Sequence, residues 1–164
     1  MTLLLWFLRH CRCVNLAGHS AGAHLLVSMM NHLVNQSSIY LHLVNVIYPI
    51  AGAFDLTELR YTKVANNNNL LSLTDQNVQR LSPMFYDYSK WKDVTFRIKF
   101  ITAEHDAPKL IQHSNQLCDI LNGFLLVASC QTIALSNVDH FNVVTELAHK
   151  DFKLTKILTD DLQQ

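Results

Sequence analysis

A serine between small residues near the start of the chain has the pattern expected of an enzymatic nucleophile. Residues 18–22 read Gly-His-Ser-Ala-Gly, and G-x-S-x-G between a strand and a helix is the sequence form of a turn that exposes the serine hydroxyl above a sheet. Residues 14–17 are short and mostly apolar, as in a buried parallel strand, and a helix is predicted from Ala21 to about Val34. We therefore predict that Ser20 is a nucleophile; the alternative is a serine that only caps the following helix.

Such a serine needs a base and an acid that orients the base, and here they are expected in the chain order serine, acid, histidine. Asp106 follows the predicted strand 96–102 and is the expected acid, with Glu104 as its rival. His140 follows the last predicted strand, which lies within 125–135, and is the expected base. A solvated loop carboxylate or helix cap, and an ordinary loop histidine, are the alternative interpretations of these residues.

Two further histidines lie close to the serine in sequence, but neither has the independent approach that a general base requires. His19 is part of the turn itself, and His24 lies one helical turn further on. In the predicted chemistry, His140 removes the serine proton and then protonates the leaving group, while Asp106 fixes the imidazole tautomer. The backbone N–H of Ala21 would donate to the oxyanion.

Alternating strands and helices predict an α/β fold for the whole chain. A further strand is expected at 43–49, and helices at 108–121, 141–149 and 152–158. In the helix after the serine, Leu25, Met29 and Leu33 are four residues apart and are expected on one face. Asn122 and Gly123 read as the end of the helix at 108–121.

We expect one domain, 1–164, with residues 51–95 as an inserted loop region. Aromatic residues in this region could wall a pocket, although local packing is the simpler interpretation. They are Tyr61, Phe85, Tyr86, Tyr88 and Trp91. Residues 1–8 are apolar but lack a basic start and a small-residue cleavage site, so we interpret them as a truncated or alternative start rather than a secretion signal.

Composition narrows the classes of function. The chain has 164 residues and a formal net charge of zero, so nothing favours a nucleic acid or an anionic membrane as partner. Four cysteines show neither metal-ligand nor disulfide-framework spacing, which predicts reduced thiols in a cytoplasmic protein. They are Cys11, Cys13, Cys118 and Cys130. No metal-ligand cluster or glycine-rich phosphate loop is present in the sequence, and we expect no cofactor.

Several segments together resemble one enzyme family. Residues 16–25 (Leu-Ala-Gly-His-Ser-Ala-Gly-Ala-His-Leu), 52–59 (Gly-Ala-Phe-Asp-Leu-Thr-Glu-Leu) and 138–141 (Val-Asp-His-Phe) are similar to kynurenine formamidase (arylformamidase), with 66–71 and 80–83 in support. That family consists of α/β-hydrolases that convert N-formyl-L-kynurenine to L-kynurenine and formate in tryptophan breakdown. The resemblance implies the C-terminal half of this fold, a mostly parallel sheet flanked by helices, with Ser20, Asp106 and His140 as the triad.

The sequence also departs from the family. The resemblance implies a His-Gly-Gly motif upstream whose N–H groups complete the oxyanion hole, yet no two of the four glycines here are adjacent. Smaller differences are Ala107, Lys109 and Asn142 near the acid and the base. Without further strands beside it, the strand at 14–17 would be an exposed apolar edge, which favours aggregation or a homodimer. A small-acyl carboxylesterase of the same fold and a non-catalytic remnant that binds a partner therefore remain alternatives.

Overall fold

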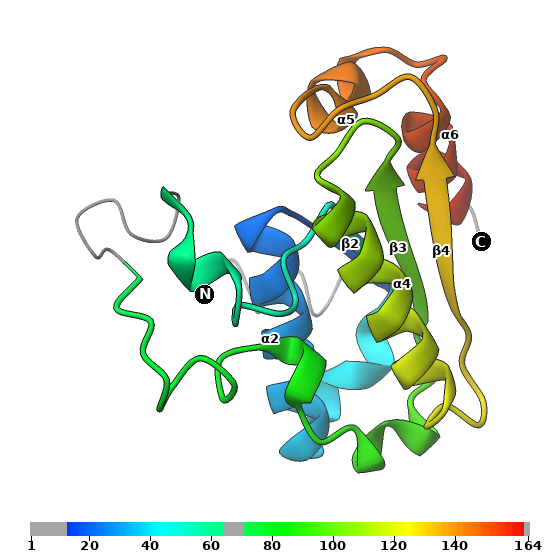
Figure 1. The fold of residues 1–164 in the computed structure, drawn as a ribbon. Coiled ribbons are helices and arrows are strands. Elements are labelled where there is room, and N and C mark those ends of the chain that lie inside the picture. The colour runs from blue at the N-terminus through cyan, green and yellow to red at the C-terminus, as the bar shows by residue number, and fades with distance from the viewer. Residues whose placement is uncertain (1–12, 64–70, 163–164) are drawn as a thin grey trace, which may run out of the picture.

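A computed structural model describes residues 13–63 and 71–162, and its centre is a parallel four-stranded sheet (Figure 1). The strands are β1 (Val14–His19), β2 (Val44–Ile50), β3 (Arg97–Ala103) and β4 (Cys130–Leu135), paired in that order. The predicted parallel α/β sheet is confirmed, and all four predicted strands are present. The expectations for residues 1–8, for Cys11 and for most of 66–71 lie outside the described residues.

Helices cover both faces of the sheet. The helices α2 (Ala21–Asn35) and α4 (Pro108–Asn122) pack on one face, and α6 (Lys153–Leu162) packs on the other (Figure 1). Ile98 and Phe100 of β3 belong to the first core, whereas Ile101 belongs to the second. A strand buried on both sides needs apolar residues at successive positions, as Phe100 and Ile101 show.

The face of α2 that packs on the sheet is not the one that carries Leu25 and Met29. Leu25 is 67% exposed and Met29 40% exposed. The buried face instead carries small and branched residues together with one methionine: Ala23, Leu26, Val27, Met30 and Val34. Apolar residues occur all round this helix, so the spacing that places Leu25, Met29 and Leu33 on one face does not decide which stripe is buried.

The strand β1 is the edge of the sheet formed by the described residues. Its residues are half-buried or, at Ala17, exposed, whereas the last five residues of β2 are fully buried. The exposed Leu25 and Met29 lie on the helix that follows it. An apolar strand with one free edge is a template for pairing with another chain.

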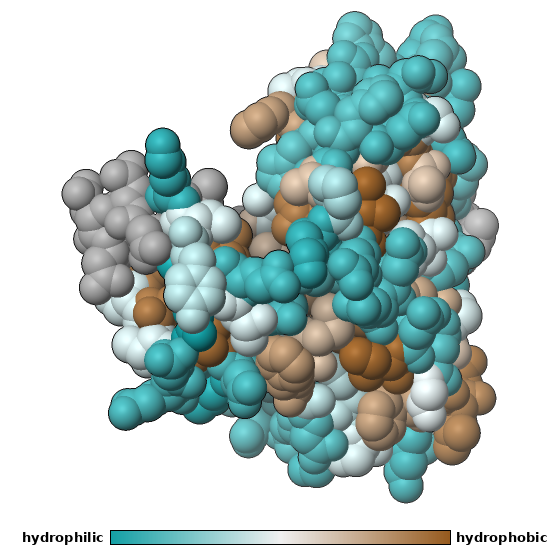
Figure 2. Space-filling view, viewed as in Figure 1, coloured by the Kyte–Doolittle hydropathy of each residue, from teal (hydrophilic) through white to brown (hydrophobic). Residues whose placement is uncertain are grey.

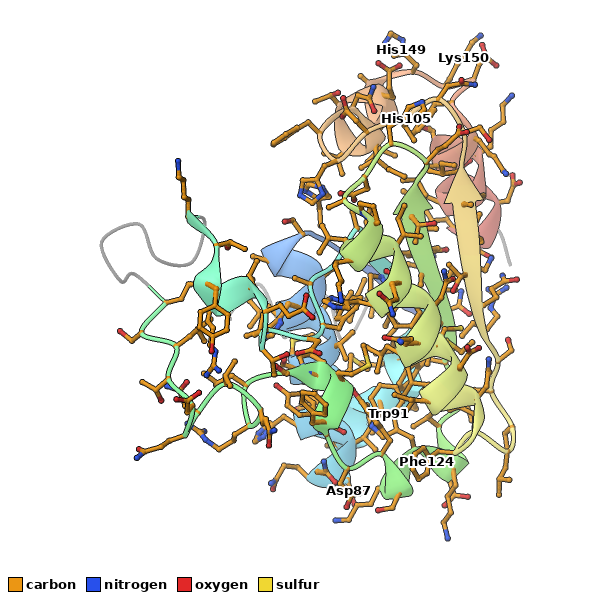
Figure 3. All side chains as sticks on the ribbon, viewed as in Figure 1. Asp87, Trp91, His105, Phe124, His149 and Lys150 are labelled. Atoms are coloured by element: carbon orange, nitrogen blue, oxygen red, sulfur yellow. The ribbon has the colours of Figure 1, made fainter. Side chains whose placement is uncertain are left out.

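Among the described residues of the 51–95 region, 51–63 and 71–95, the short turns are η2 (Leu59–Tyr61), η4 (Pro83–Phe85) and η5 (Ser89–Asp93). Tyr88 and Trp91 are fully buried in the core, and the Trp91 Nε1–H donates to Asn31 Oδ1 at 2.8 Å. Trp91 lies at the end of the molecule opposite His105 (Figure 3). These two aromatic rings therefore serve local packing, the simpler of the two interpretations.

The C-terminal region is less helical than predicted. The helix expected at 141–149 is split into α5 (Asn142–Thr145) and η6 (Glu146–Ala148), while the one expected at 152–158 is the longer α6. Gly123 does follow α4 directly, but its φ of −68° is right-handed, so it is not a left-handed cap. Among the helices of the described residues, none combines the length and the apolarity needed to cross a bilayer.

A buried carboxylate attaches α6 to the sheet. Asp161 is 2% exposed and accepts hydrogen bonds from Lys99 at 2.5 Å and from the Tyr48 hydroxyl, and it pairs with Arg97 at 3.0 Å. Burial alone would raise the pKa of Asp161, but the hydrogen bonds from Lys99 and Tyr48 and the charges of Lys99 and Arg97 outweigh it and lower the pKa. The ionised form therefore stabilises the folded state.

We predict that Asp161→Asn lowers the free energy of unfolding by roughly 2 kcal/mol at pH 7, because Lys99 and Arg97 lose their shared anion. A lowered native pKa stabilises above the ordinary carboxyl pKa, so the advantage of the wild type should shrink as the pH falls below about 4. Urea unfolding from pH 3 to pH 8 measures this. The matched control is Asp160→Asn, since Asp160 is exposed on the same helix; equal losses in both variants would contradict the role of the cluster.

Candidate active site

Ser20 occupies a strained turn between β1 and α2. Its φ of 55° and ψ of −116° lie in a region of backbone conformation that residues other than glycine seldom adopt. The Ser20 N–H donates to the Ile50 carbonyl at 2.9 Å, which ties the turn to the end of β2. The Ser20 side chain makes no capping hydrogen bond to α2. The capping alternative is therefore contradicted, and the hydroxyl is available for another contact.

The two glycines of the motif are not equivalent. A Cβ on Gly18 would lie 2.3 Å from the Gly22 carbonyl oxygen, so the strand and the helix can approach this closely only without a side chain there. A Cβ on Gly22 would meet nothing within 4 Å. Close packing of the turn therefore requires a residue without a side chain at Gly18 but not at Gly22.

Three side chains that lie far apart in sequence form one chain of hydrogen bonds. The Ser20 Oγ is 3.0 Å from His140 Nε2, and His140 Nδ1 lies 3.0 Å and 3.1 Å from the two carboxylate oxygens of Asp106. Because a carboxylate only accepts, His140 Nδ1 carries the proton, which leaves Nε2 to accept from the serine hydroxyl. This is the tautomer that a general base needs.

Asp106 reaches this position from the carboxyl end of β3. Its side chain is 3% exposed, and its Oδ1 also accepts the Ala107 N–H at 2.7 Å. The Asp106 N–H donates to the Ala103 carbonyl in a tight turn directly after the strand. The carboxylate is thus held in place by the backbone N–H of Ala107 as well as by His140.

Glu104, the rival acid, has a different contact. Its Oε2 accepts the Asn137 N–H at 2.7 Å, and its backbone N–H donates to the Leu135 carbonyl. Asn137 has a left-handed φ of 60°, where asparagine is tolerated better than most residues. Glu104 therefore stabilises the turn that leads from β4 to His140, whereas the hydrogen bonds of the His140 ring go to Asp106 and Ser20.

The loop that carries His140 is closed by reciprocal capping. Asp139 Oδ1 accepts the N–H groups of Phe141 and Asn142, each at 2.8 Å, while Asn142 Oδ1 accepts the Asp139 N–H at 2.6 Å. These hydrogen bonds, with the one from the Asn142 N–H the largest cause, lower the pKa of Asp139. Asn142, noted in the sequence as a small departure from the family, thus has a defined part in shaping this loop.

His19 makes a contact that the sequence analysis missed. Its Nε2–H donates to the His140 carbonyl at 2.7 Å, and the two imidazole rings lie 4.8 Å apart between centroids. His19 was correctly set aside as a base, because its ring is directed to a backbone carbonyl. The position of His19 at the end of β1, next to Ser20, was the available signal that its side chain could reach the loop that carries His140. His24 contacts the Ala53 carbonyl instead, at 2.8 Å.

Ala21 is the first residue of α2. Its N–H belongs to the group at a helix start that has no acceptor within the helix, where the helix dipole also favours negative charge. Such an N–H adjacent to Ser20 is suited to an oxyanion. Within 13–63 and 71–162, no three His, Cys, Asp or Glu side chains are grouped so that they could hold a metal ion.

A cavity of about 530 Å³ lies at the other end of α2, away from Ser20. Its lining includes Val34 from the last turn of that helix, Lys90 and Lys92 from η5, and Phe96, which directly precedes β3. The end of the 51–95 segment thus borders a hollow that is separate from the Ser20 hydroxyl. Figure 2 shows the end of the molecule around α5 as mainly hydrophilic, whereas apolar patches lie lower on the visible face.

The parallel sheet, the helices on both faces and the strand–turn–helix around Ser20 are those of an α/β-hydrolase. Solved structures agree on this fold: a putative thioesterase from a Silicibacter species has a TM-score of 0.68 at 19% identity over 87% of this chain and 49% of its own. An esterase from Pyrobaculum calidifontis has a TM-score of 0.60 at 18% identity over 85% of this chain and 49% of its own. No protein-family model matches the chain.

Within that class, the chain is a homologue of the kynurenine formamidases. It is 33% identical over 149 residues to the kynurenine formamidase of Drosophila melanogaster, which covers 87% of this chain and 47% of the relative. It is 27% identical over 150 residues to that of Danio rerio, covering 91% of this chain and 49% of the relative. The chain thus spans about half the length of the curated relatives it matches, and the resemblance found in the sequence is confirmed over that half.

We predict that Gly18→Ala destabilises the fold by roughly 2 kcal/mol or more, because the new Cβ overlaps the backbone of Gly22. Gly22→Ala is the matched control and should be neutral or slightly stabilising, since alanine is the better helix former and the space is open. Thermal unfolding followed by circular dichroism compares the two variants. Equal unfolding temperatures for both would contradict the unequal roles of the glycines.

Proposed function

We propose that this chain carries the catalytic triad of a kynurenine formamidase-type serine hydrolase, which hydrolyses N-formyl-L-kynurenine to L-kynurenine and formate. The observation that carries the proposal is the hydrogen-bonded chain Ser20–His140–Asp106. Its three members come from separate turns, at the ends of β1 and β3 and beyond the end of β4. The similarity to enzymes named kynurenine formamidase supports the choice of substrate.

In the proposed reaction, the Ser20 Oγ attacks the formyl carbon while His140 Nε2 takes the hydroxyl proton. The tetrahedral intermediate collapses as His140 returns that proton to the aryl nitrogen, which leaves as the amine of L-kynurenine. Water, deprotonated by the same imidazole, then attacks the formyl ester and releases formate and the free serine. Asp106 holds Nδ1–H throughout and stabilises the imidazolium that forms in each half of the cycle.

The oxyanion of both intermediates would be stabilised by the N–H of Ala21 at the start of α2. A single donor is a weak oxyanion hole. Removal of one donor from such a site costs on the order of 10²–10³ in turnover. The resemblance assigns the other donors to a His-Gly-Gly motif, which this sequence does not contain.

The proposal further places this chemistry in the cytoplasm, with a small molecule as substrate and no cofactor. Its support is the state of the thiols: Cys13, Cys118 and Cys130 are free among the described residues. Serine hydrolysis by a triad draws its proton transfers and its nucleophile from protein side chains alone.

Hydrolysis of N-formyl-L-kynurenine by the purified chain tests the proposal. We expect formate release that falls at least 10³-fold in Ser20→Ala, because the nucleophile is lost. Ser136→Ala, in an exposed turn, is the control and should keep full activity. A folded sample with no turnover, or turnover unaffected by Ser20→Ala, would contradict the proposal. A preference for small aryl esters over the formamide would identify the carboxylesterase alternative.

His19 is proposed as a positioning residue that holds the His140 loop through the carbonyl of His140. His19→Leu removes the donor, and we expect kcat to fall roughly 10-fold with little change in KM, because the imidazole shifts relative to Ser20. His19→Gln keeps an N–H donor at similar reach and should recover most of the loss. A similar loss of kcat in both variants would show that the ring, rather than its hydrogen bond, is what matters.

A further inference from the structure

Two buried cysteines lie side by side at the end of the sheet opposite Ser20. Cys118 is in the penultimate turn of α4, and Cys130 is the first residue of β4. Their sulfur atoms are 2.8 Å apart, and the residues are 4% and 8% exposed. A disulfide bond is about 2.05 Å long, so the two sulfurs are within 1 Å of bonding distance.

The backbone around the pair is held in place by groups other than the sulfurs. Asn122 Nδ2 donates to the Cys130 carbonyl at 3.0 Å, and Asn122 Oδ1 accepts the Cys130 N–H at 3.2 Å. Asn122 lies in the last turn of α4 and Cys130 at the start of β4, so these two hydrogen bonds join two regular elements. A bond between the sulfurs therefore requires only a small adjustment of side chains, which is the condition that most engineered disulfides fail.

The two thiols have different electrostatic surroundings. A hydrogen bond from the Cys130 thiol lowers the pKa of Cys118 and outweighs the effect of burial, with help from Thr132 and Asn122. The same contact with Cys118, together with burial, raises the pKa of Cys130 far above its ordinary value. Cys118 is thus the thiol that reaches the reactive thiolate form more readily, and Cys130 is placed to react with it afterwards.

We infer that Cys118 and Cys130 form an oxidation site, at which a hydroperoxide converts the thiol pair into a disulfide that joins α4 to β4. The Cys118 thiolate attacks one peroxide oxygen, which breaks the O–O bond, gives a sulfenic acid and releases one water. The Cys130 sulfur then attacks the Cys118 sulfur, the S–S bond forms, and the hydroxyl leaves as a second water. In total, two thiols and hydrogen peroxide give one disulfide and two waters.

The inferred route for peroxide to the pair is the turn that links α4 to β4. Leu126 and Val127 in this turn are 77% and 71% exposed, so it packs loosely and can open locally. Figure 3 places Phe124, at the start of the turn, far from His105, which precedes Asp106. Oxidation should therefore strengthen the attachment of α4 to the sheet without changing the geometry of the Ser20 site. The inference stands independently of the proposed hydrolase activity.

Mass spectrometry of the full chain after treatment with hydrogen peroxide tests the inference. After alkylation in denaturant, trypsin releases both cysteines in the single peptide 110–150, which contains no Lys or Arg before Lys150. We expect this peptide to be unalkylated and about 2 Da lighter than its reduced, unalkylated form. After reduction with dithiothreitol, both cysteines should become alkylated. Cys13, exposed and in the peptide 13–60, reports separately on the strength of the oxidant.

Single variants separate the two roles. In Cys130→Ala, Cys118 should stop at the sulfenic acid, which dimedone traps. In Cys118→Ala, Cys130 should remain fully alkylatable.

In the wild type, oxidation should raise Tm by roughly 5–10 °C and leave the ester or formamide turnover within twofold. Full alkylation of Cys118 and Cys130 at a peroxide dose that oxidises Cys13 would overturn the inference. So would overoxidation of Cys118 in the wild type without a disulfide, or an unchanged Tm once the disulfide has formed.

Discussion

The backbone of Ser20 is the constraint on which the rest of the site depends. A left-handed residue between a parallel strand and a helix costs about 1–3 kcal/mol, and it persists here because neighbouring groups hold it from both sides. The missing Cβ of Gly18 lets α2 begin directly against β1, and the carbonyl of Ile50 accepts the Ser20 N–H. The strained turn directs the hydroxyl away from the helix, so that a base from elsewhere in the chain can reach it.

The parallel order of the strands brings that base within reach. The carboxyl ends of β1, β3 and β4 all lie at one edge of the sheet, so the loops after them meet although 120 residues separate Ser20 from His140. Hydrogen bonds between these loops then set the positions of the three side chains relative to one another. Val138 accepts the His105 N–H, and Glu104 holds Asn137. Together with the contact from His19 to His140, they fix the distances between side chains that no single loop could determine.

Sequence patterns were sufficient to locate the four strands and to select the three residues that meet, because each depends on local signals. The small residues around Ser20, and a polar residue after each apolar strand, can be recognised one segment at a time. The packing face of α2 could not be chosen, because apolar side chains surround that helix and only the sheet decides which are covered. The contact of His19 and the Cys118–Cys130 pair join segments 121 and 12 residues apart. The place of His19 at the end of a strand was a signal that the prediction did not use, and nothing in the spacing indicated the cysteine pair.

The central claim is that Ser20 is an activated nucleophile, and covalent labelling with a fluorophosphonate tests it most directly, because labelling needs no particular substrate. The account predicts one adduct on the peptide 13–60, localised to Ser20 by fragmentation, and strongly reduced when His140 is replaced by alanine. The other serines of that peptide serve as internal controls. A folded chain that remains unlabelled, or one labelled equally in the Ser20→Ala variant, would contradict the account.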